Sequence, residues 1–116
     1  MKCQKLDVWK VSARLSVNVY KTLEQCKQWG FKDQITRTCL SIPSNIAEGM
    51  EKESLKEQAR FLEISKGSAA EFATQTYIGI ETGYIEKQTG QDWIKQTNQI
   101  LAMLTNLRKK VLGGVR

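Results

Sequence analysis

Apolar residues recur at intervals of three and four along most of the chain. In the first segment, residues 7–27, they form one stripe: Val8, Val11, Leu15, Val19, Leu23 and Cys26. Such spacing is typical of an amphipathic helix that buries one face, and Asp7 is placed to cap it. A second set widens this stripe beyond what one partner helix covers: Trp9, Ala13, Val17 and Tyr20. Residues 28–31 are predicted to form a turn, with Gly30 as the stop.

The second segment, residues 33–51, contains the only proline of the chain, inside a helical pattern. Its apolar face consists of Ile35, Cys39, Ile42 and Ile46. Proline at position 43 removes a backbone donor and crowds the carbonyl of Cys39, at a cost of about 3 kcal/mol or more. The pattern therefore predicts a helix kinked at Pro43. A polar stripe at the same spacing could satisfy the freed carbonyl with short side chains: Thr38, Ser41, Ser44, Asn45 and Glu48.

Two further helices are predicted from their caps and spacing. Ser54 and Glu57 form a capping box that opens a helix running to about Gly83. Its inner side is Leu55, Ala59, Leu62, Ala69, Phe72, Thr76 and Ile80. Its small residues indicate close packing, because each interior glycine costs about 1 kcal/mol: Gly67, Ser68, Ala69, Ala70, Ala73 and Gly79. Thr89 and Asp92 predict the start of the last helix, whose stripe is Trp93, Thr97, Ile100, Leu104, Leu107 and Val111, up to residues 113–114.

The predicted fold is all-α, an antiparallel up-down-up-down four-helix bundle with a proline-kinked second helix. No strand-like alternation competes with the helices, and the short connections favour antiparallel neighbours. At 116 residues the chain is expected to be a single domain, residues 1–116. It has no apolar run of roughly 20 residues and no signal peptide, so we expect a cytoplasmic protein without a membrane partner.

The chemistry available to the chain is narrow. It has no histidine, which removes the commonest general base and the commonest metal ligand. The three cysteines, Cys3, Cys26 and Cys39, lack metal-site spacing and favour core packing. No catalytic residue, cofactor or metal is therefore expected. Acid–base chemistry between Glu48 and Glu71 is a disfavoured alternative, because lone glutamates on helices usually pair with arginine or backbone amides.

Positive charge is the clearest functional signal. The net charge of +6 and the pI near 9.3 favour an acidic partner such as nucleic acid. Basic residues cluster in three places: Lys10, Arg14 and Lys21; Lys52, Lys56 and Arg60; and Arg108, Lys109, Lys110 and Arg116. They could contact phosphates with strong salt dependence. The alternative is a solvated face with pairs such as Glu57–Arg60 and Glu63–Lys66. The solvated-face alternative is favoured for the cluster Lys52, Lys56 and Arg60, and phosphate binding is favoured for the other two clusters.

Two further features have more than one interpretation. Four polar residues could line a pocket for a ligand or a partner strand, but a structural role in the kink and in a subunit contact is favoured: Ser41, Asn45, Glu48 and Arg37. Five aromatic residues look exposed and could stack bases, although subunit contacts are the favoured interpretation: Trp9, Tyr20, Trp29, Tyr77 and Trp93.

The second and third segments carry a specific resemblance to a known family. Ser41-Ile42-Pro43-Ser44-Asn45-Ile46-Ala47-Glu48-Gly49, and then Phe61-Leu62-x-Ile64-Ser65-Lys66-Gly67-Ser68-Ala69-x-Glu71, resemble the 23S rRNA intervening-sequence protein family. The resemblance covers nearly the whole chain. It marks a set of motif residues: Ser41, Pro43, Ser44, Asn45, Glu48, Gly49, Gly67, Ser68 and Glu71. The chain departs from the family at Ala69-Ala70 and Phe72-Ala73, where larger aliphatic and acidic residues are more common.

The resemblance implies a bundle that assembles into a ring-like homopentamer in bacteria. Relatives of this fold act as accessory proteins of diversity-generating retroelements, where they bind a reverse transcriptase and its RNA. Together with the charge, this predicts a non-enzymatic oligomer that binds nucleic acid, with RNA favoured, or a ribonucleoprotein. A role as an accessory factor to a reverse transcriptase is part of this hypothesis. The alternative is a protein–protein interaction scaffold with no direct nucleic-acid contact.

Overall fold

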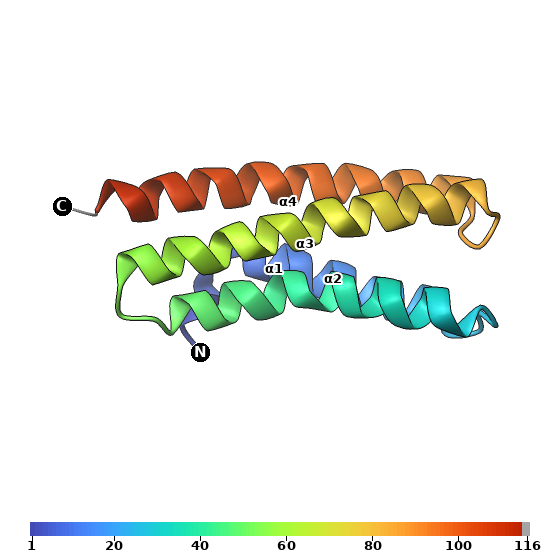
Figure 1. Cartoon of the computed structure of the whole chain (residues 1–116), viewed down its shortest axis with the longest axis horizontal. Helices are drawn as coiled ribbons and strands as arrows, with labels where there is room; N and C mark the ends of the chain where they lie inside the picture. The colour runs from blue at the N-terminus through green and yellow to red at the C-terminus, as the bar shows by residue number, and fades with distance from the viewer. Residues whose placement is uncertain (115–116) are drawn as a thin grey trace.

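A computed structural model describes residues 1–114 and confirms the all-α four-helix bundle. A short 3-10 helix, η1 (Lys2–Lys5), precedes α1 (Asp7–Thr22), α2 (Trp29–Met50), α3 (Leu55–Glu81) and α4 (Lys87–Gly113). The helices lie side by side, with the N-terminus, the α2–α3 turn and the C-terminal end of α4 at one end (Figure 1). The α1–α2 and α3–α4 connections lie at the other end. None of the described helices is long and apolar enough to span a membrane.

The predicted boundary between the first two helices is wrong. α1 ends at Thr22 rather than Lys27, and α2 begins at Trp29, so Gly30 lies in the first turn of α2. The chain leaves the helix at Leu23, whose buried side chain completes the apolar stripe. Among the described residues only Gly83, after α3, has a positive φ, of 79°. Gly83 thus has the left-handed conformation of a glycine stop, which we had assigned to Gly30.

One predicted helix cap is confirmed and two are wrong. Ser54 caps α3, because its hydroxyl oxygen accepts the Glu57 N–H at 3.3 Å. Asp7 is instead the first residue of α1, after the cap residue Leu6, which makes no side-chain cap bond. Thr89 lies inside α4, which begins at Lys87. Of the three predicted caps, only Ser54 makes a side-chain cap bond within residues 1–114.

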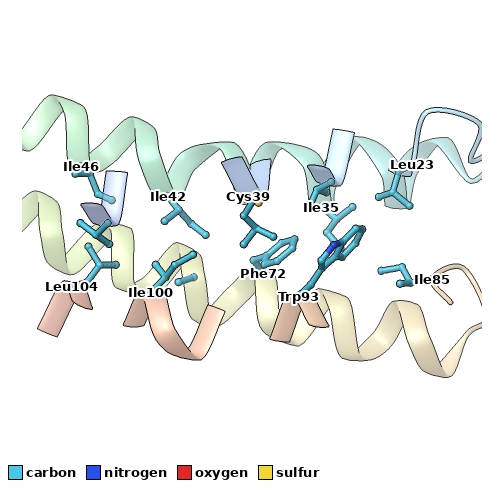
Figure 2. Packing of buried hydrophobic residues seen from close by; sticks show 14 of the residues in the cluster. Leu23, Ile35, Cys39, Ile42, Ile46, Phe72, Ile85, Trp93, Ile100 and Leu104 are labelled. Atoms are coloured by element: carbon cyan, nitrogen blue, oxygen red, sulfur yellow. The ribbon is translucent and has the colours of Figure 1, made fainter. Parts of the chain in front are cut away.

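The core forms where the apolar stripes of the four helices meet (Figure 2). The α2 stripe Ile35, Cys39, Ile42 and Ile46 is completely buried, as predicted. Phe72 of α3 and Trp93 of α4 face it, with ring centroids 6.0 Å apart. Trp93 is only 1% exposed, so its assignment as an exposed aromatic is wrong. Its indole N–H donates to Asn18 Oδ1 at 3.1 Å and thus links α4 to α1.

α2 continues through Pro43 as one helix of 22 residues, and the predicted kink is not confirmed. The Ser41 hydroxyl donates to Thr38 O at 2.7 Å, and the Asn45 amide donates to Ser41 O at 2.8 Å. From α3, the buried Ser65 hydroxyl donates to Ile42 O at 2.8 Å. These bonds lie on either side of the Cys39 carbonyl rather than reaching it. The Ile42 carbonyl, which directly precedes Pro43, thus accepts a hydrogen bond from another helix, α3.

Cys39 behaves as a core residue, as predicted. Burial raises the pKa of its thiol to about 12, and a hydrogen bond from the Ser16 hydroxyl of α1 lowers this pKa by a smaller amount. The thiol is therefore neutral and unreactive at ordinary pH. Cys3 is also buried, and Cys26 is half-buried against the core.

The two glycines inside α3 have opposite environments, which yields a stability prediction. A Cβ on Gly79 would lie 2.5 Å from Ile85 Cδ1 and 2.7 Å from Phe31 Cζ, whereas Gly67 has nothing within 4 Å. Gly67→Ala should raise the free energy of unfolding by up to about 1 kcal/mol through helix propensity. Gly79→Ala should lower it by about 1–3 kcal/mol through overpacking. Urea denaturation of both variants at equal concentration measures this, and equal effects would contradict it.

Candidate functional site

The tertiary structure brings two of the three basic clusters together at one end of the bundle. Lys52, at the α2–α3 turn, and the C-terminal end of α4 both lie at this end (Figure 1). Arg108 Nε bridges the helices: it donates to Ala59 O at 3.3 Å and lies 3.2 Å from Glu63 Oε2. We call this surface the basic end; it comprises Lys52, Lys56, Arg60, Arg108, Lys109 and Lys110. Arg116, also predicted to bind, lies outside the described residues.

Three of these cations already have protein partners. Arg60 Nε lies 2.7 Å from Glu57 Oε2, and this exposed pair lowers the pKa of the Glu57 carboxyl. Arg60 and Lys52 also lie over the Phe61 ring, at 4.7 Å and 5.1 Å from its centroid. Arg108 is held by Glu63 and Ala59. These contacts favour the solvated-face interpretation for Arg60 and a helix-linking role for Arg108.

Lys56, Lys109 and Lys110 are the remaining cations of the basic end. All three are exposed, and within residues 1–114 none forms an ion pair. Lys110 lies at the edge of a shallow hollow between α1 and α4 that Asp7 also lines. Lysines without partners can exchange water for phosphate oxygens at little cost, because no existing contact is lost.

The first-helix cluster belongs to α1 alone. Lys10, Arg14 and Lys21 are exposed along α1, and none forms an ion pair in the described part of the chain. Lys21 lines a groove between α1 and α2.

An apolar groove of about 560 Å³ lies between the outer sides of α1 and α2. Its lining includes the four residues that widen the first-helix stripe: Trp9, Ala13, Val17 and Tyr20. Val17 is 53% exposed and Leu40, from α2, is 44% exposed. As predicted, no helix within residues 1–114 covers this part of the stripe, since α1 packs mainly on α2 and little on α4. Exposed contiguous apolar surface of this kind marks an interaction site.

The proline motif contributes to this groove through Pro43, Ser44 and Ala47. The polar residues expected to line a pocket do not line it: Ser41 and Asn45 bond their own helix. Gly49 is buried because Phe61 of α3 occupies the space of a Cβ, 2.8 Å away. Gly67 and Glu71 are exposed on α3, and Ser68 is half-buried.

Glu48 and Glu71, the carboxylates considered for acid–base chemistry, are exposed and far apart. The Ser65–Ile42 bond aligns α3 with α2, and Glu48 lies six residues from Ile42 toward the basic end. Glu71 lies six residues from Ser65 in the opposite direction. At about 1.5 Å per residue the two are about 18 Å apart along the bundle, too far to act as a pair. Among the described residues no cluster of histidine, cysteine or acidic side chains could hold a metal ion.

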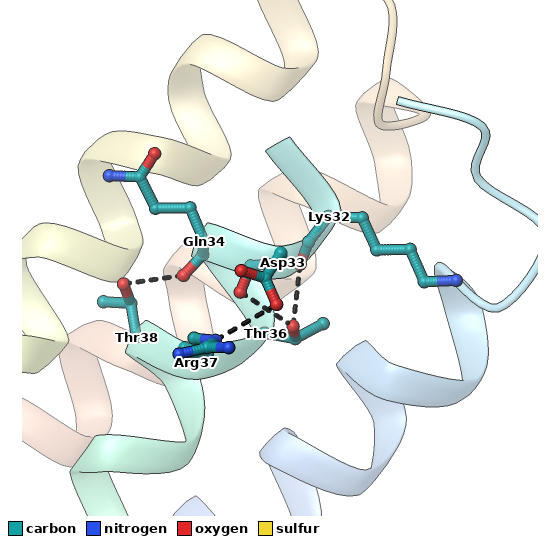
Figure 3. A network of polar contacts seen from close by, with 6 residues as sticks. All are labelled: Lys32, Asp33, Gln34, Thr36, Arg37 and Thr38. Atoms are coloured by element: carbon teal, nitrogen blue, oxygen red, sulfur yellow. Dashed lines mark hydrogen bonds and ion pairs between the residues drawn. The ribbon is translucent and has the colours of Figure 1, made fainter. Parts of the chain in front are cut away.

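Arg37, considered with the proline motif, belongs to a local network in the first half of α2 (Figure 3). Its Nε lies 3.0 Å from Asp33 Oδ1, and both side chains are exposed. The Thr36 hydroxyl donates to Lys32 O at 2.7 Å, and the Thr38 hydroxyl donates to Gln34 O at 2.9 Å. All these bonds join residues of one helix, so the network stabilises α2 locally and forms no pocket.

The other four aromatic residues considered for base stacking lie either on the exposed surface or at the apolar groove. Trp29 is 69% exposed, and Lys32 Nζ lies 5.1 Å from the centroid of its ring. Tyr77 of α3 is also exposed. Trp9 is half-buried and Tyr20 is exposed at the groove. Only Trp29 and Tyr77 therefore remain as exposed rings outside the groove among the five residues considered.

Comparisons with known proteins agree with this fold. A family model described as 23S rRNA-intervening sequence protein matches residues 4–106. A solved structure, described as a protein with unknown function from the S23 ribosomal protein family of Bacteroides thetaiotaomicron, superposes with a TM-score of 0.82. It is 23% identical and covers 88% of this chain and 98% of its own. No curated protein matches the chain.

Proposed function

Because this chain belongs to the 23S rRNA-intervening sequence protein family, we propose that it is a non-enzymatic oligomeric bundle that binds nucleic acid through basic faces. RNA is the favoured ligand, free or in a ribonucleoprotein. The observation that carries the proposal is the set of exposed lysines without ion-pair partners at the basic end: Lys56, Lys109 and Lys110. The net charge of +6 supports it.

The proposed mechanism is electrostatic. Lysine and arginine side chains displace counterions from phosphates and hold the backbone with little base readout. The proposed assembly is a homopentameric ring in the bacterial cytoplasm, in line with the family resemblance. A ring repeats each basic surface, so individually weak contacts add through avidity. In a retroelement setting the same ring would be an accessory factor for a reverse transcriptase.

A salt titration of binding tests this proposal. The probes are a structured RNA and a duplex DNA, with light scattering on the same sample to measure the mass of the assembly. We expect binding that weakens steeply between 50 and 200 mM salt, because each phosphate contact contributes about −0.7 to −0.9 to the slope of log K against log salt. Absent or salt-insensitive binding to both polymers would overturn the proposal.

The apolar groove favours a second candidate, a protein–protein interaction scaffold that makes no direct nucleic-acid contact. Its α1 lining is apolar and exposed, unlike the basic end. A protein partner captured from a lysate would then remain bound after nuclease treatment. Loss of the partner on nuclease treatment would favour the nucleic-acid proposal instead.

A further inference from the structure

The groove between α1 and α2 has an apolar floor and one basic edge. Tyr20 and Leu40 lie in it with more than two-fifths of their surface exposed. Lys21 lines the groove, and Lys10 and Arg14 precede it on the same row of α1, at intervals of four and seven residues. None of the three forms an ion pair within residues 1–114. A matching partner therefore presents apolar side chains flanked by carboxylates.

The outer face of α3 has this character. Ile64, Gly67, Glu71 and Ile78 follow one another at intervals of three, four and seven residues, which place them on one side of the helix, and all are exposed. Ile64 and Ile78 are 39% and 49% exposed. A side chain at Gly67 would meet nothing within 4 Å, so this point of the face offers space for a close neighbour.

The two faces also match in height along the bundle. The Ser65–Ile42 bond makes Ile64 level with Pro43, at the groove. Ser16 of α1 lies beside the buried Cys39 of α2, so Lys21, five residues further along α1, is about level with residue 34 of α2 and hence with residue 73 of α3. Glu71 is then within about two residues, or roughly 3 Å, of the level of Lys21. Rotation of a copy about an axis parallel to the bundle preserves these levels.

We propose that a second copy of this chain occupies the groove with the outer face of its α3, Ile64 seated in the apolar floor and Glu71 beside Lys21. This rests on the self-association in the proposed function and names its interface. Within the described residues α3 packs on α2 and α4 but not on α1, so the two faces lie on different sides of one protomer. Each docked copy leaves its own groove open for the next. Such a heterologous contact yields a ring when the rotation closes.

Two exposed glycines provide a matched test by light scattering. Gly67→Arg places a bulky cation against the basic edge of the groove and should raise the concentration at which half the assembly dissociates at least about tenfold. Gly30→Arg makes the same change in the first turn of α2, also with nothing within 4 Å, and should leave this concentration unchanged. Both variants should keep the helix content of the wild-type protein in circular dichroism.

Exchanging the two charges tests whether Glu71 of one copy lies beside Lys21 of the next. Lys21→Glu and Glu71→Lys should each weaken the assembly, and the double variant should restore it, which a purely structural effect on the protomer would not do. A wild-type protein at protomer mass, or an assembly indifferent to Gly67→Arg, would overturn this interface. Salt-dependent RNA binding is measured on the same samples. The nucleic-acid proposal therefore stands or fails separately from the interface.

Discussion

Replacing Trp93 by alanine is expected to lower the free energy of unfolding by about 3–5 kcal/mol. The indole is 1% exposed in the middle of the core and packs against Phe72. Its N–H bond to Asn18 is one of few links between α4 and α1, which pack little on each other. Alanine would leave a cavity and remove one of the two donors of Asn18 Oδ1, the other being the Thr22 hydroxyl. Urea denaturation followed by circular dichroism measures the loss.

Trp29→Ala is the matched control for this change, because the same side chain is removed from an exposed position. It should change the free energy of unfolding by no more than about 0.5 kcal/mol. Both variants are compared with the wild-type protein at one concentration, since assembly adds to apparent stability. Similar losses for Trp93→Ala and Trp29→Ala would contradict the packing described for the core.

The double charge reversal Lys109→Glu and Lys110→Glu is expected to weaken RNA binding at least about tenfold. Both lysines are exposed at the basic end without ion-pair partners in the described chain. Losing two phosphate contacts should also reduce the slope of log K against log salt by about 2. The measurement is a salt titration of binding to a structured RNA.

The matched control is Lys87→Glu with Lys95→Glu, which makes the same charge change in the other half of α4, where both lysines are also exposed. This variant should lose affinity only through the change in net charge and keep its salt slope. Equal losses for the two double variants would contradict a localised interface and leave net charge as the only determinant of binding.

Much of the fold follows from local patterns in the sequence. The predicted stripe of α2 is buried, and that of α4 is buried as far as Leu104, because a period near 3.6 residues places Ile35, Ile42 or Ile100 on one side of a helix. The cap bond at Ser54 is confirmed because its hydroxyl and the Glu57 N–H lie in one turn, whereas the Glu57 carboxylate pairs with Arg60. The first helix boundary was wrong because Gly30 favours a stop only when the backbone takes a positive φ.

The candidate site is only partly predictable. The basic clusters are visible in the sequence, but the pairing of Arg108 with Glu63 joins residues far apart along the chain. The sequence does not predict that Asn18 and Ser65 each bond a partner on another helix. In the sequence each is a polar residue beside an apolar stripe. Many exposed residues have the same position, so the sequence does not distinguish the two cases. Trp93 was assigned both to the core and to the surface, and the tertiary structure places it in the core.

The sequence by itself determined that this protein is a bundle of four helices with a strongly basic surface and no histidine chemistry. These properties depend on spacing, composition and charge, which act locally or sum over the chain. The tertiary structure decided which lysines are left without partners, that Glu48 and Glu71 are far apart, and that α1 and α2 leave an apolar groove uncovered. These depend on which faces of the helices meet, because burial and ion pairing are set by neighbours from distant parts of the chain.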